Sequence, residues 1–282
     1  MVEIVPVGPF DRQKSPDLSA LASYAETFYG VPFRVSDKRL SLEDVCKNRQ
    51  KKATAVTVGG ARCGNEGQLQ LECADVFSAL LSLRLAKDVL VRVAVTMADL
   101  YPVEDGEAWN FVFGQANAFD GVGVFSFSRY AIDPATGEFP IPWRGHPTTK
   151  NYGGLAAGQA AAIGRTLRSS DCAGADELEA GRRARIFRRS CAVLTHEVGH
   201  LFGMSHCIYY DCLMNGSNSL EESESRQIHL CPVCLRKLHL SVGFIPIERA
   251  RKLLRVYSEL GWERDAAWTE SWLTSANGAT AP

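Results

Sequence analysis

Three histidines and one glutamate lie close together in the second half of the chain, at spacings that suit metal-dependent hydrolysis. Residues 196–206 read HEVGHLFGMSH, which is the pattern HExxHxxGxxH. On a helix, residues four apart share one face, so His196 and His200 can direct their imidazoles at one ion. Glu197 can then reach a water molecule beside that ion and take a proton from it. The pattern predicts a catalytic zinc site.

The glycine and the third histidine extend the motif beyond a length expected by chance. Gly203 permits a positive φ at the end of the helix, so the chain can turn back and bring His206 to the same ion. Three neutral imidazoles leave the fourth tetrahedral position open, as in catalytic zinc sites. The alternative, a histidine-rich helix end without a metal, would suit a bare HExxH but not the longer pattern. We therefore expect His196, His200 and His206 to bind a catalytic zinc ion.

Four cysteines follow the third histidine and form a second candidate metal site. Cys207 and Cys212 come first, and the pair Cys231 and Cys234 forms a C-x-x-C knuckle. Such a knuckle turns both sulfurs toward one ion, and an earlier pair completes a closed tetrahedral shell. The alternatives are a redox-active C-x-x-C or four unrelated buried thiols, but a redox pair would not require the earlier two cysteines nearby. The spacing favours a second, structural zinc ion.

The two candidate sites share one short segment. Because His206 and Cys207 are adjacent, an extended backbone sends their side chains in opposite directions, toward two different ions. The thiolate zinc would then hold the loop that supplies the third histidine. Met214, followed by an Asn-Gly turn, is predicted to form an apolar floor beneath the histidines, with ordinary core packing as the alternative. His229 and His239 flank the knuckle and are reserve ligands.

Composition places these motifs in an ordinary globular protein and excludes several classes. The chain has 282 residues, of which 46% are hydrophobic, and its formal net charge is −1. Near-neutral charge argues against nucleic acid as a partner. The chain also has no run of about 18 apolar residues, the length that would indicate a membrane span. The N-terminus lacks the apolar segment of a secretion signal, and nine cysteines suit a reducing compartment. We expect a monomeric intracellular protein, cytoplasmic or nuclear and not secreted, without a membrane partner.

Hydrophobic patterns predict the strands and helices that must position the motifs. Strands are expected over residues 2–7, 33–35, 89–95, 111–116 and 122–127, and helices over 17–29, 69–85, 176–202 and 247–260. Polar residues, glycine and proline predict loops over 42–69 and 131–170. Residues 121–124 are the candidate sheet edge for an extended peptide, since little side-chain bulk would block backbone pairing there. Glycine bulges in an edge strand are the alternative.

The joint pattern HExxHxxGxxHC, xxxxC, xM and CxxC resembles the archaemetzincins, also called archaelysins, a branch of the metzincin zinc peptidases. The resemblance extends upstream to residues 91–101, which end in Asp-Leu-Tyr, and to residues 109–116 and 121–130, which look like the next two strands of the family. It is strongest from residue 89 to residue 234, and it does not cover the tail after about Phe244.

The resemblance implies a role for each residue of the two clusters. By it, the three histidines would bind the catalytic zinc, with Glu197 as the general base. The second zinc would be held by Cys207, Cys212, Cys231 and Cys234, and Met214 would belong to a Met-turn. The expected cofactors are therefore two zinc ions per chain, one catalytic and one structural.

The same resemblance implies an α/β fold. A metzincin-like twisted mixed sheet would be joined by a long active-site helix and by a small C-terminal subdomain carrying the four-cysteine zinc site. Residues 1–245 would form the metallopeptidase domain, in which residues 189–245 hold the zinc helix, the Met-turn and the four-cysteine subdomain. The resemblance does not cover residues 246–282, where the amphipathic pattern predicts a C-terminal helix and a tail packed on that domain.

The expected function is zinc-dependent hydrolysis of peptide bonds in a peptide or protein substrate, with Glu197 activating water. The alternative is a catalytically weak or inactive module that keeps zinc for folding and binds peptides or proteins. An intact Glu197 argues against it, because a pure binding module has no chemical need for that carboxylate. A zinc-dependent nucleic-acid binder built on the four cysteines is disfavoured, since basic and aromatic residues do not alternate around Cys231.

Overall fold

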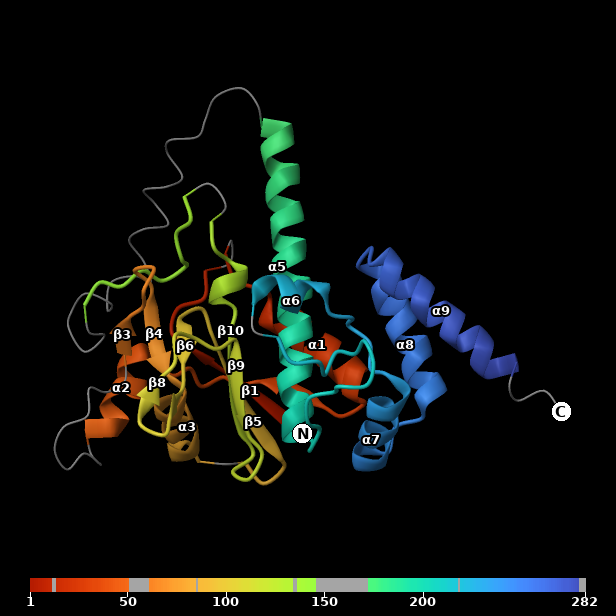
Figure 1. Ribbon diagram of the computed structural model, residues 1–282, viewed down its shortest axis with the longest axis horizontal. Helices are drawn as coiled ribbons and strands as arrows, with labels where there is room; N and C mark the ends of the chain where they lie inside the picture. The colour runs from red at the N-terminus through yellow and green to blue at the C-terminus, as the bar shows by residue number, and fades with distance from the viewer. Residues whose placement is uncertain are drawn as a thin grey trace.

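The computed structural model describes residues 1–11, 14–50, 61–84, 86–133, 136–145, 172–217 and 219–278. A long helix, α5 (Cys172–Leu201), runs through the middle of the molecule. The strands lie on one side of this helix, and the last two helices of the chain lie on the other (Figure 1). This arrangement confirms the expected α/β class, with a mixed sheet and a long helix that carries the histidine motif.

The main sheet has five strands in the order β2-β1-β5-β10-β9. They are β1 (Val2–Val7), β2 (Phe33–Val35), β5 (Val91–Thr96), β9 (Gly114–Asn117) and β10 (Val122–Ser126). All neighbours pair in parallel except β9, which runs antiparallel to β10 at one edge. Strands β1, β5 and β10 are buried along their whole length, as expected of parallel strands covered on both faces.

The edge of this sheet differs from the prediction. Residues 121–124 were expected at the edge, but β10 lies between β5 and β9 and is fully buried, so that expectation is wrong. A Cβ at Gly123 would lie 3.3 Å from the ring of Phe125 and 3.4 Å from Leu201. This glycine therefore serves close packing inside the sheet. The strand at this edge of the sheet is β9, whose residues are only half-buried, and β2 lies at the opposite edge.

A second sheet joins segments that the sequence patterns did not connect. Its three strands, in the order β3-β4-β6, are β3 (Ala61–Cys63), β4 (Leu69–Glu72) and β6 (Asp99–Tyr101), and a hairpin of β7 (Val103–Glu104) and β8 (Glu107–Ala108) follows. The helix expected over 69–85 is therefore wrong at its start, because α3 (Cys73–Ser82) begins only after β4. The loop expected over 42–69 likewise contains α2 (Leu42–Gln50) and β3.

Long-range partners explain why β4 is a strand. It pairs in parallel with β6, and its Gln70 side chain donates a 2.8 Å hydrogen bond to the buried carboxylate of Asp99. Arg129 forms an ion pair with the same carboxylate at 2.8 Å. Such partners lie about 30 residues or more away in sequence, so local periodicity alone does not reveal them.

Among the remaining helices, α1 (Leu18–Tyr29) contacts β2 and α5, and the C-terminal helices extend the molecule beyond α5 (Figure 1). The others are α6 (Leu220–Ser225), α7 (Pro232–Val242), α8 (Pro246–Glu259) and α9 (Glu263–Gly278), with a short 3-10 turn, η1 (Ser128–Tyr130). Helix α1 begins after Asp17, whose side chain accepts hydrogen bonds from two backbone amides, and ends at Gly30 with φ of 70°. These signals match the helix expected over 17–29. Most of the loop expected over 131–170 lies outside the described residues.

Two helices, not one, follow residue 245. Helix α9 adds a second helix to the one expected there, and it packs along α8, which contacts α1 (Figure 1).

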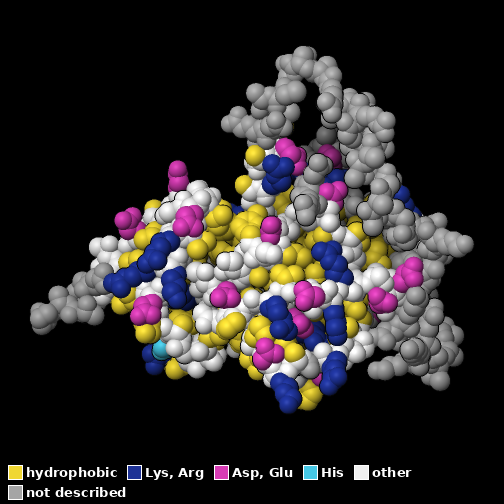
Figure 2. Space-filling model, turned by 180° about the vertical axis from the view of Figure 1, so that it is seen from behind, with side chains coloured by type: hydrophobic (Ala, Val, Ile, Leu, Met, Phe, Trp, Pro, Cys, Tyr) yellow, Lys and Arg dark blue, Asp and Glu magenta, His cyan; other side chains and the backbone are white. Residues whose placement is uncertain are grey.

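On the face shown in Figure 2, basic and acidic side chains are interspersed among apolar ones and do not gather by sign. Among the described residues, no helix combines the length and the apolar character that crossing a membrane requires.

Asp265 ties α9 to two other parts of the fold. Its carboxylate, 3% exposed, pairs with Arg188 of α5 at 2.8 Å and lies 3.3 Å from His229 Nε2. The indole of Trp268 stacks on the His229 ring with centroids 4.0 Å apart. Burial raises the pKa of Asp265, but its hydrogen bonds with His229 and Arg188 outweigh this, so the pKa lies below its ordinary value. The charged carboxylate is therefore stabilised by folding, and this stabilisation is lost only as the pH falls through that lowered pKa.

Asp265→Asn is expected to lower the free energy of unfolding by about 2 kcal/mol at pH 7, because it removes the buried negative charge that pairs with Arg188 and places an amide nitrogen where the carboxylate had a second acceptor oxygen. Urea denaturation measures the change. Glu270→Gln, an exposed change on the same helix, is the matched control and should shift stability by less than about 0.5 kcal/mol. Equal stability of the two variants would contradict a structural role for Asp265.

Candidate metal centres

The last turns of α5 and the loop after it bring the three predicted histidines together. The Nε2 atoms of His196 and His200 lie 3.1 Å apart. The ring centroid of His206 lies 5.3 Å from that of His196 and 4.8 Å from that of His200. One nitrogen from each ring falls within 4.8 Å of the others. A tetrahedral zinc ion with bonds of about 2.0 Å separates its nitrogen ligands by about 3.3 Å. The donor set and spacing therefore fit one zinc ion.

Backbone carbonyls hold the first two rings in the orientation that metal binding requires. His196 Nδ1 lies 2.8 Å from the carbonyl oxygen of Leu213, and His200 Nδ1 lies 2.7 Å from that of Met204. A nitrogen facing a carbonyl oxygen carries the proton, so Nε2 is left as the lone-pair donor. Burial lowers the pKa of both histidines, and of His206, so all three rings are neutral near pH 7. Neutral imidazoles are the form that binds zinc.

The turn that delivers His206 follows the prediction for Gly203. This residue has φ of 83°, which confirms the left-handed conformation expected at the helix end. The Met204 amide donates back to the carbonyl oxygen of Gly199 at 3.0 Å, which closes the turn after α5. A Cβ at Gly216 would lie 3.3 Å from His206 Nδ1, so the following turn packs directly against the third histidine.

Glu197 lies beside the histidines in a buried position. Its side chain projects from α5 toward strand β9 and is 8% exposed. Burial raises the pKa of Glu197 to about 8, and the positive charge of Arg226 opposes the shift. A divalent cation nearby would lower this pKa further. A carboxyl group that titrates near neutral pH can both take and return a proton, which suits a general acid and base.

Strand β9 approaches the Glu197 side chain closely at its first residue, Gly114. A Cβ at Gly114 would lie 2.9 Å from Glu197 Cδ and 3.0 Å from Oε1, closer than ordinary contacts allow. This glycine belongs to neither of the metal-binding motifs found in the sequence. It is the last residue of the run Trp-Asn-Phe-Val-Phe-Gly, and nothing in this run indicates that the glycine lies next to the histidine motif in the fold.

Gly114→Ala is expected to displace the Glu197 carboxylate and lower kcat/KM by about tenfold or more, with zinc retained by the histidines. Peptide cleavage assays and metal analysis of the same preparation measure both quantities. Gly181→Ala, on an exposed part of α5 where a Cβ would meet nothing within 4 Å, is the matched control and should leave activity unchanged. Full activity of Gly114→Ala would show that the carboxylate position is not set by β9.

Arg226 is a second residue near the site that sequence reasoning missed. Its Nη1 donates a hydrogen bond to the Asn215 carbonyl at 2.9 Å, and Nη2 donates to Ser223 Oγ at 2.9 Å. Nη1 also lies 2.9 Å from His196 Nδ1, which carries a proton and therefore does not accept from it. The charge of Arg226 contributes to the lowered pKa values of the histidines. Its only sequence signal is a lone arginine in the spacer between Met214 and Cys231, which is too weak to assign.

The four predicted cysteines form the second cluster. Their sulfurs all lie within 4.8 Å of one another, and Cys207 Sγ is 3.8 Å from Cys231 Sγ. Zinc–sulfur bonds of about 2.3 Å place tetrahedral ligands about 3.8 Å apart, whereas a disulfide needs about 2.05 Å. All four thiols are free and buried. The amide of Cys234 points at Cys231 Sγ at 3.4 Å, where the start of α7 favours a negative charge. This donor set fits a closed zinc shell.

Adjacent residues divide between the clusters, as expected from the sequence. His206 belongs to the histidine group and Cys207 to the thiol group. The amide of Cys207 donates to the Met214 carbonyl at 2.8 Å, so the segment between them closes into a compact loop. Met214 is fully buried, and a Cβ at Gly199 would lie 2.7 Å from its sulfur. The methionine thus packs beneath the helix that carries the histidines.

The two reserve ligands lie outside both clusters. His229 faces Asp265 and stacks on Trp268, and His239 Nδ1 lies 2.6 Å from the Phe244 carbonyl oxygen. Neither belongs to a described group of metal-ligand spacing. The reserve role is therefore not needed to complete either shell.

Comparison with known proteins gives one family. The model of Peptidase family M54 matches residues 179–240, which span the histidine motif and all four cysteines. Archaemetzincin-2 of Homo sapiens is 38% identical over 259 residues, which are 88% of this chain and 66% of the relative. Archaemetzincin-2 of Macaca fascicularis is 35% identical over 258 residues, again 88% of this chain and 66% of the relative. The chain thus spans just under two thirds of these relatives.

Two further matches carry the same description. Archaemetzincin-1 of Homo sapiens is 34% identical over 210 residues, covering 73% of this chain and 38% of the relative. Among solved structures, archaemetzincin from Methanopyrus kandleri matches with a TM-score of 0.49 and 21% identity, over 86% of this chain and 96% of that one.

Proposed function

The chain belongs to the archaemetzincin family of zinc metallopeptidases, and we propose from this premise that it hydrolyses peptide bonds at the histidine cluster, with Glu197 as the general base. The observation that supports the proposal is the buried Glu197 carboxyl beside three neutral imidazoles with metal-ligand spacing. The substrate is a peptide or protein.

The mechanism assigns proton transfer to Glu197. Zinc held by His196, His200 and His206 would supply Lewis acidity, which polarises a carbonyl group and acidifies water. Glu197 Oε takes the proton from the attacking water and then passes it to the nitrogen of the leaving amine. Burial holds the pKa of this carboxyl near 8 without a cation, so the group is not locked in its charged form. Gly114 keeps Glu197 beside strand β9.

The edge of the main sheet is the proposed platform for the substrate backbone. Strand β9 is half-buried, pairs with β10 on one side and has no strand partner among the described residues on the other. Its first residue contacts Glu197. An extended peptide added to this edge by backbone hydrogen bonds would pass close to the carboxyl group. Specificity for side chains would then come from the loops that border β9.

We also propose separate roles for the cysteine cluster, for Met214 and for the two segments of the chain. Cys207, Cys212, Cys231 and Cys234 would hold a second zinc ion with no open position, giving two ions per chain, and Met214 would form the floor of a Met-turn. Residues 1–245 would make up the peptidase domain, and residues 246–282 would add the helices α8 and α9. The proposed active unit is a monomer.

A peptide library tests the activity. The zinc-loaded chain is incubated with mixed peptides, and products are identified by mass spectrometry before and after treatment with 1,10-phenanthroline. We expect the chelator to abolish cleavage and added zinc to restore it, because water can be activated at the histidine site only when the metal is bound. Binding of peptides without any cleavage under these conditions would instead support the inactive zinc-stabilised binding module.

A further inference from the structure

Three consecutive large apolar side chains are exposed shortly after the third histidine. They are Ile208, Tyr209 and Tyr210, which are 82%, 72% and 56% exposed. Soluble proteins seldom expose such a run unless it serves recognition, because each of these side chains gains free energy by leaving water. The loop that carries them, residues 207–212, begins and ends at a cysteine of the four-cysteine cluster. This loop is therefore a candidate for contact with another molecule.

Hydrogen bonds to Asn215 hold the loop in one shape. The side-chain nitrogen of Asn215 donates to the carbonyl oxygens of Cys207 and Tyr210, at 2.7 Å and 2.9 Å. The side-chain oxygen accepts from the amide of Cys212 at 2.8 Å. Because the backbone is already ordered, a ligand that binds the exposed side chains does not have to order the loop first, and binding costs less entropy.

The side chains of residues 206–208 alternate between two sides of the chain. His206 is exposed and belongs to the histidine cluster, and Cys207 is buried and belongs to the four-cysteine cluster. Ile208 is exposed again. In an extended segment, residues two apart lie on the same side, about 7 Å from one another. Ile208 therefore shares the exposed side of the chain with the third histidine.

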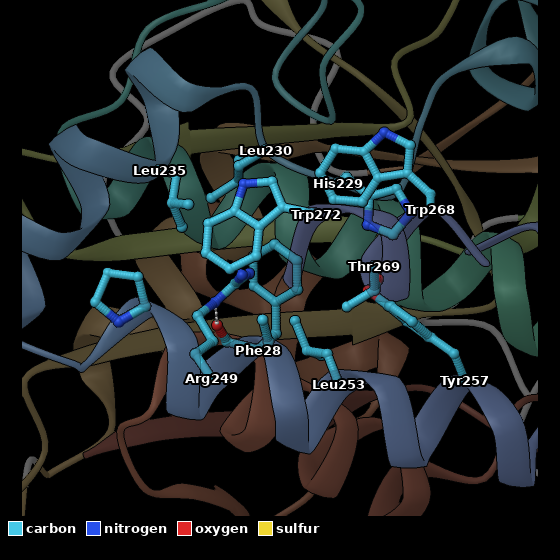
Figure 3. A pocket seen from close by; sticks show the side chains of 12 residues that line it. Phe28, His229, Leu230, Leu235, Arg249, Leu253, Tyr257, Trp268, Thr269 and Trp272 are labelled. Carbon is cyan, nitrogen blue, oxygen red and sulfur yellow. Dashed lines mark hydrogen bonds between the residues drawn. The ribbon is translucent and has the colours of Figure 1, made fainter. Parts of the chain in front are cut away.

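Apolar side chains next to the cysteine knuckle, by contrast, are covered by the C-terminal helices. Figure 3 shows Trp268 of α9 stacked on His229. Leu230, which precedes the knuckle, is 4% exposed and lines a cavity together with Trp272. That cavity has a volume of about 20 Å³, enough for one water molecule. This side of the cysteine cluster is therefore filled by the chain itself, whereas residues 208–210 are left exposed.

Strand β9 and the loop approach the histidine cluster from different sides. Strand β9 packs against α5, and its Gly114 contacts Glu197. The loop is tied to the start of α7, because Cys207 Sγ lies 3.8 Å from Cys231 Sγ. Figure 1 shows β9 and α7 on opposite sides of α5. The histidines at the end of α5 thus lie between the strand and the loop.

We propose that Ile208 contacts the substrate and favours peptides with an aliphatic or aromatic side chain next to the hydrolysed bond, with Tyr209 and Tyr210 extending the same apolar surface. This role rests on the proposed peptide hydrolysis at the histidine cluster. Backbone pairing with β9 does not distinguish side chains, so selectivity has to come from residues such as Ile208. The substrate is the assigned occupant because Ile208 lies on the side of the chain where the third histidine is exposed.

Two hydroxamic acids test this contact independently of peptide cleavage, because they bind a zinc ion that has an open coordination position. The probes are octanohydroxamate, which has an apolar chain, and acetohydroxamate, which has only a methyl group. Isothermal titration of the full zinc-loaded chain should give at least about tenfold tighter binding of octanohydroxamate, because its chain leaves water on Ile208. Equal affinities for the two probes would overturn the proposal.

Two variants locate the contact. Ile208→Ser is expected to weaken binding of octanohydroxamate by at least about fivefold and to leave binding of acetohydroxamate within about twofold. Leu240→Ser, the matched control, removes a side chain that is 70% exposed on α7 and should change neither affinity. Equal losses in both variants would refute the contact. So would unchanged affinities in Ile208→Ser together with conversion of a dimer to a monomer in sedimentation, since Ile208 would then face a second copy of the chain.

The peptide library separates this role from hydrolysis itself. Products of the wild type should be enriched in apolar residues beside the cleaved bond, and Ile208→Ser should lower this enrichment at least about fivefold while other bonds are still cleaved. Cleavage with an unchanged profile would overturn the role of Ile208 alone. Octanohydroxamate binding that depends on Ile208, without any peptide cleavage, would support the apolar contact and overturn the proposed hydrolysis.

Discussion

Glu197→Gln is expected to lower kcat for peptide cleavage by about 10²- to 10⁴-fold, the range that removal of a general base produces. Glutamine has nearly the same shape as glutamate but cannot accept a proton at neutral pH, so the substitution separates proton transfer from packing. The three histidines keep their backbone hydrogen bonds, and zinc content should stay unchanged. Steady-state kinetics and elemental analysis of one preparation measure both.

The stability of this variant gives an independent check. Burial raises the pKa of Glu197 to about 8, so without a cation this carboxyl destabilises the fold; the cost grows as the pH rises above the ordinary pKa of about 4.3 and reaches its full value above about pH 8. A neutral glutamine has no such cost, and thermal stability should be equal to or above that of the wild type. Glu221→Gln, an exposed change on α6, is the matched control for activity. Zinc retention with activity within threefold of the wild type would remove Glu197 from the role of base.

The parts of the site that could be predicted from sequence are those encoded by short-range spacing. Helical periodicity places His196 and His200 on one face, and Gly203 has the positive φ that its position after the helix suggested. The four cysteines were identifiable because metal geometry demands particular residue types at short intervals. Local chemistry thus determines both clusters almost completely.

The features that could not be predicted depend on contacts between distant segments. Gly114 matters because β9 packs against Glu197, which is 83 positions further along the chain. The burial of β10 depends on which strand pairs at its far side, and the glycines of residues 121–124 could not distinguish an interior position from an edge. Arg226 reaches His196 through the fold of the loop that contains it. A single sequence contains no signal for such pairs.

Cys231→Ser combined with Cys234→Ser is expected to reduce bound zinc from two ions per chain to about one and to lower the free energy of unfolding by several kcal/mol. A serine hydroxyl does not ionise near neutral pH and is a poor zinc ligand, and structural zinc sites contribute directly to folding free energy. Elemental analysis and denaturant unfolding measure the two effects. Cys63→Ser changes an exposed thiol outside the cluster and should leave both quantities unaltered.

The same double variant should also lose activity, although neither cysteine is near the reacting groups in sequence. The thiol cluster includes Cys207, whose neighbour His206 completes the histidine group, and the amide of Cys207 is held by the Met214 carbonyl. Without the zinc ion of the cysteine site, this loop is no longer held in place, and the third histidine is no longer fixed relative to the other two. We expect kcat/KM to fall by about tenfold or more, with partial recovery at high zinc concentration. Loss of one zinc ion with unchanged kcat/KM would show that the two centres work independently, whereas retention of both ions would show that the thiols are not ligands.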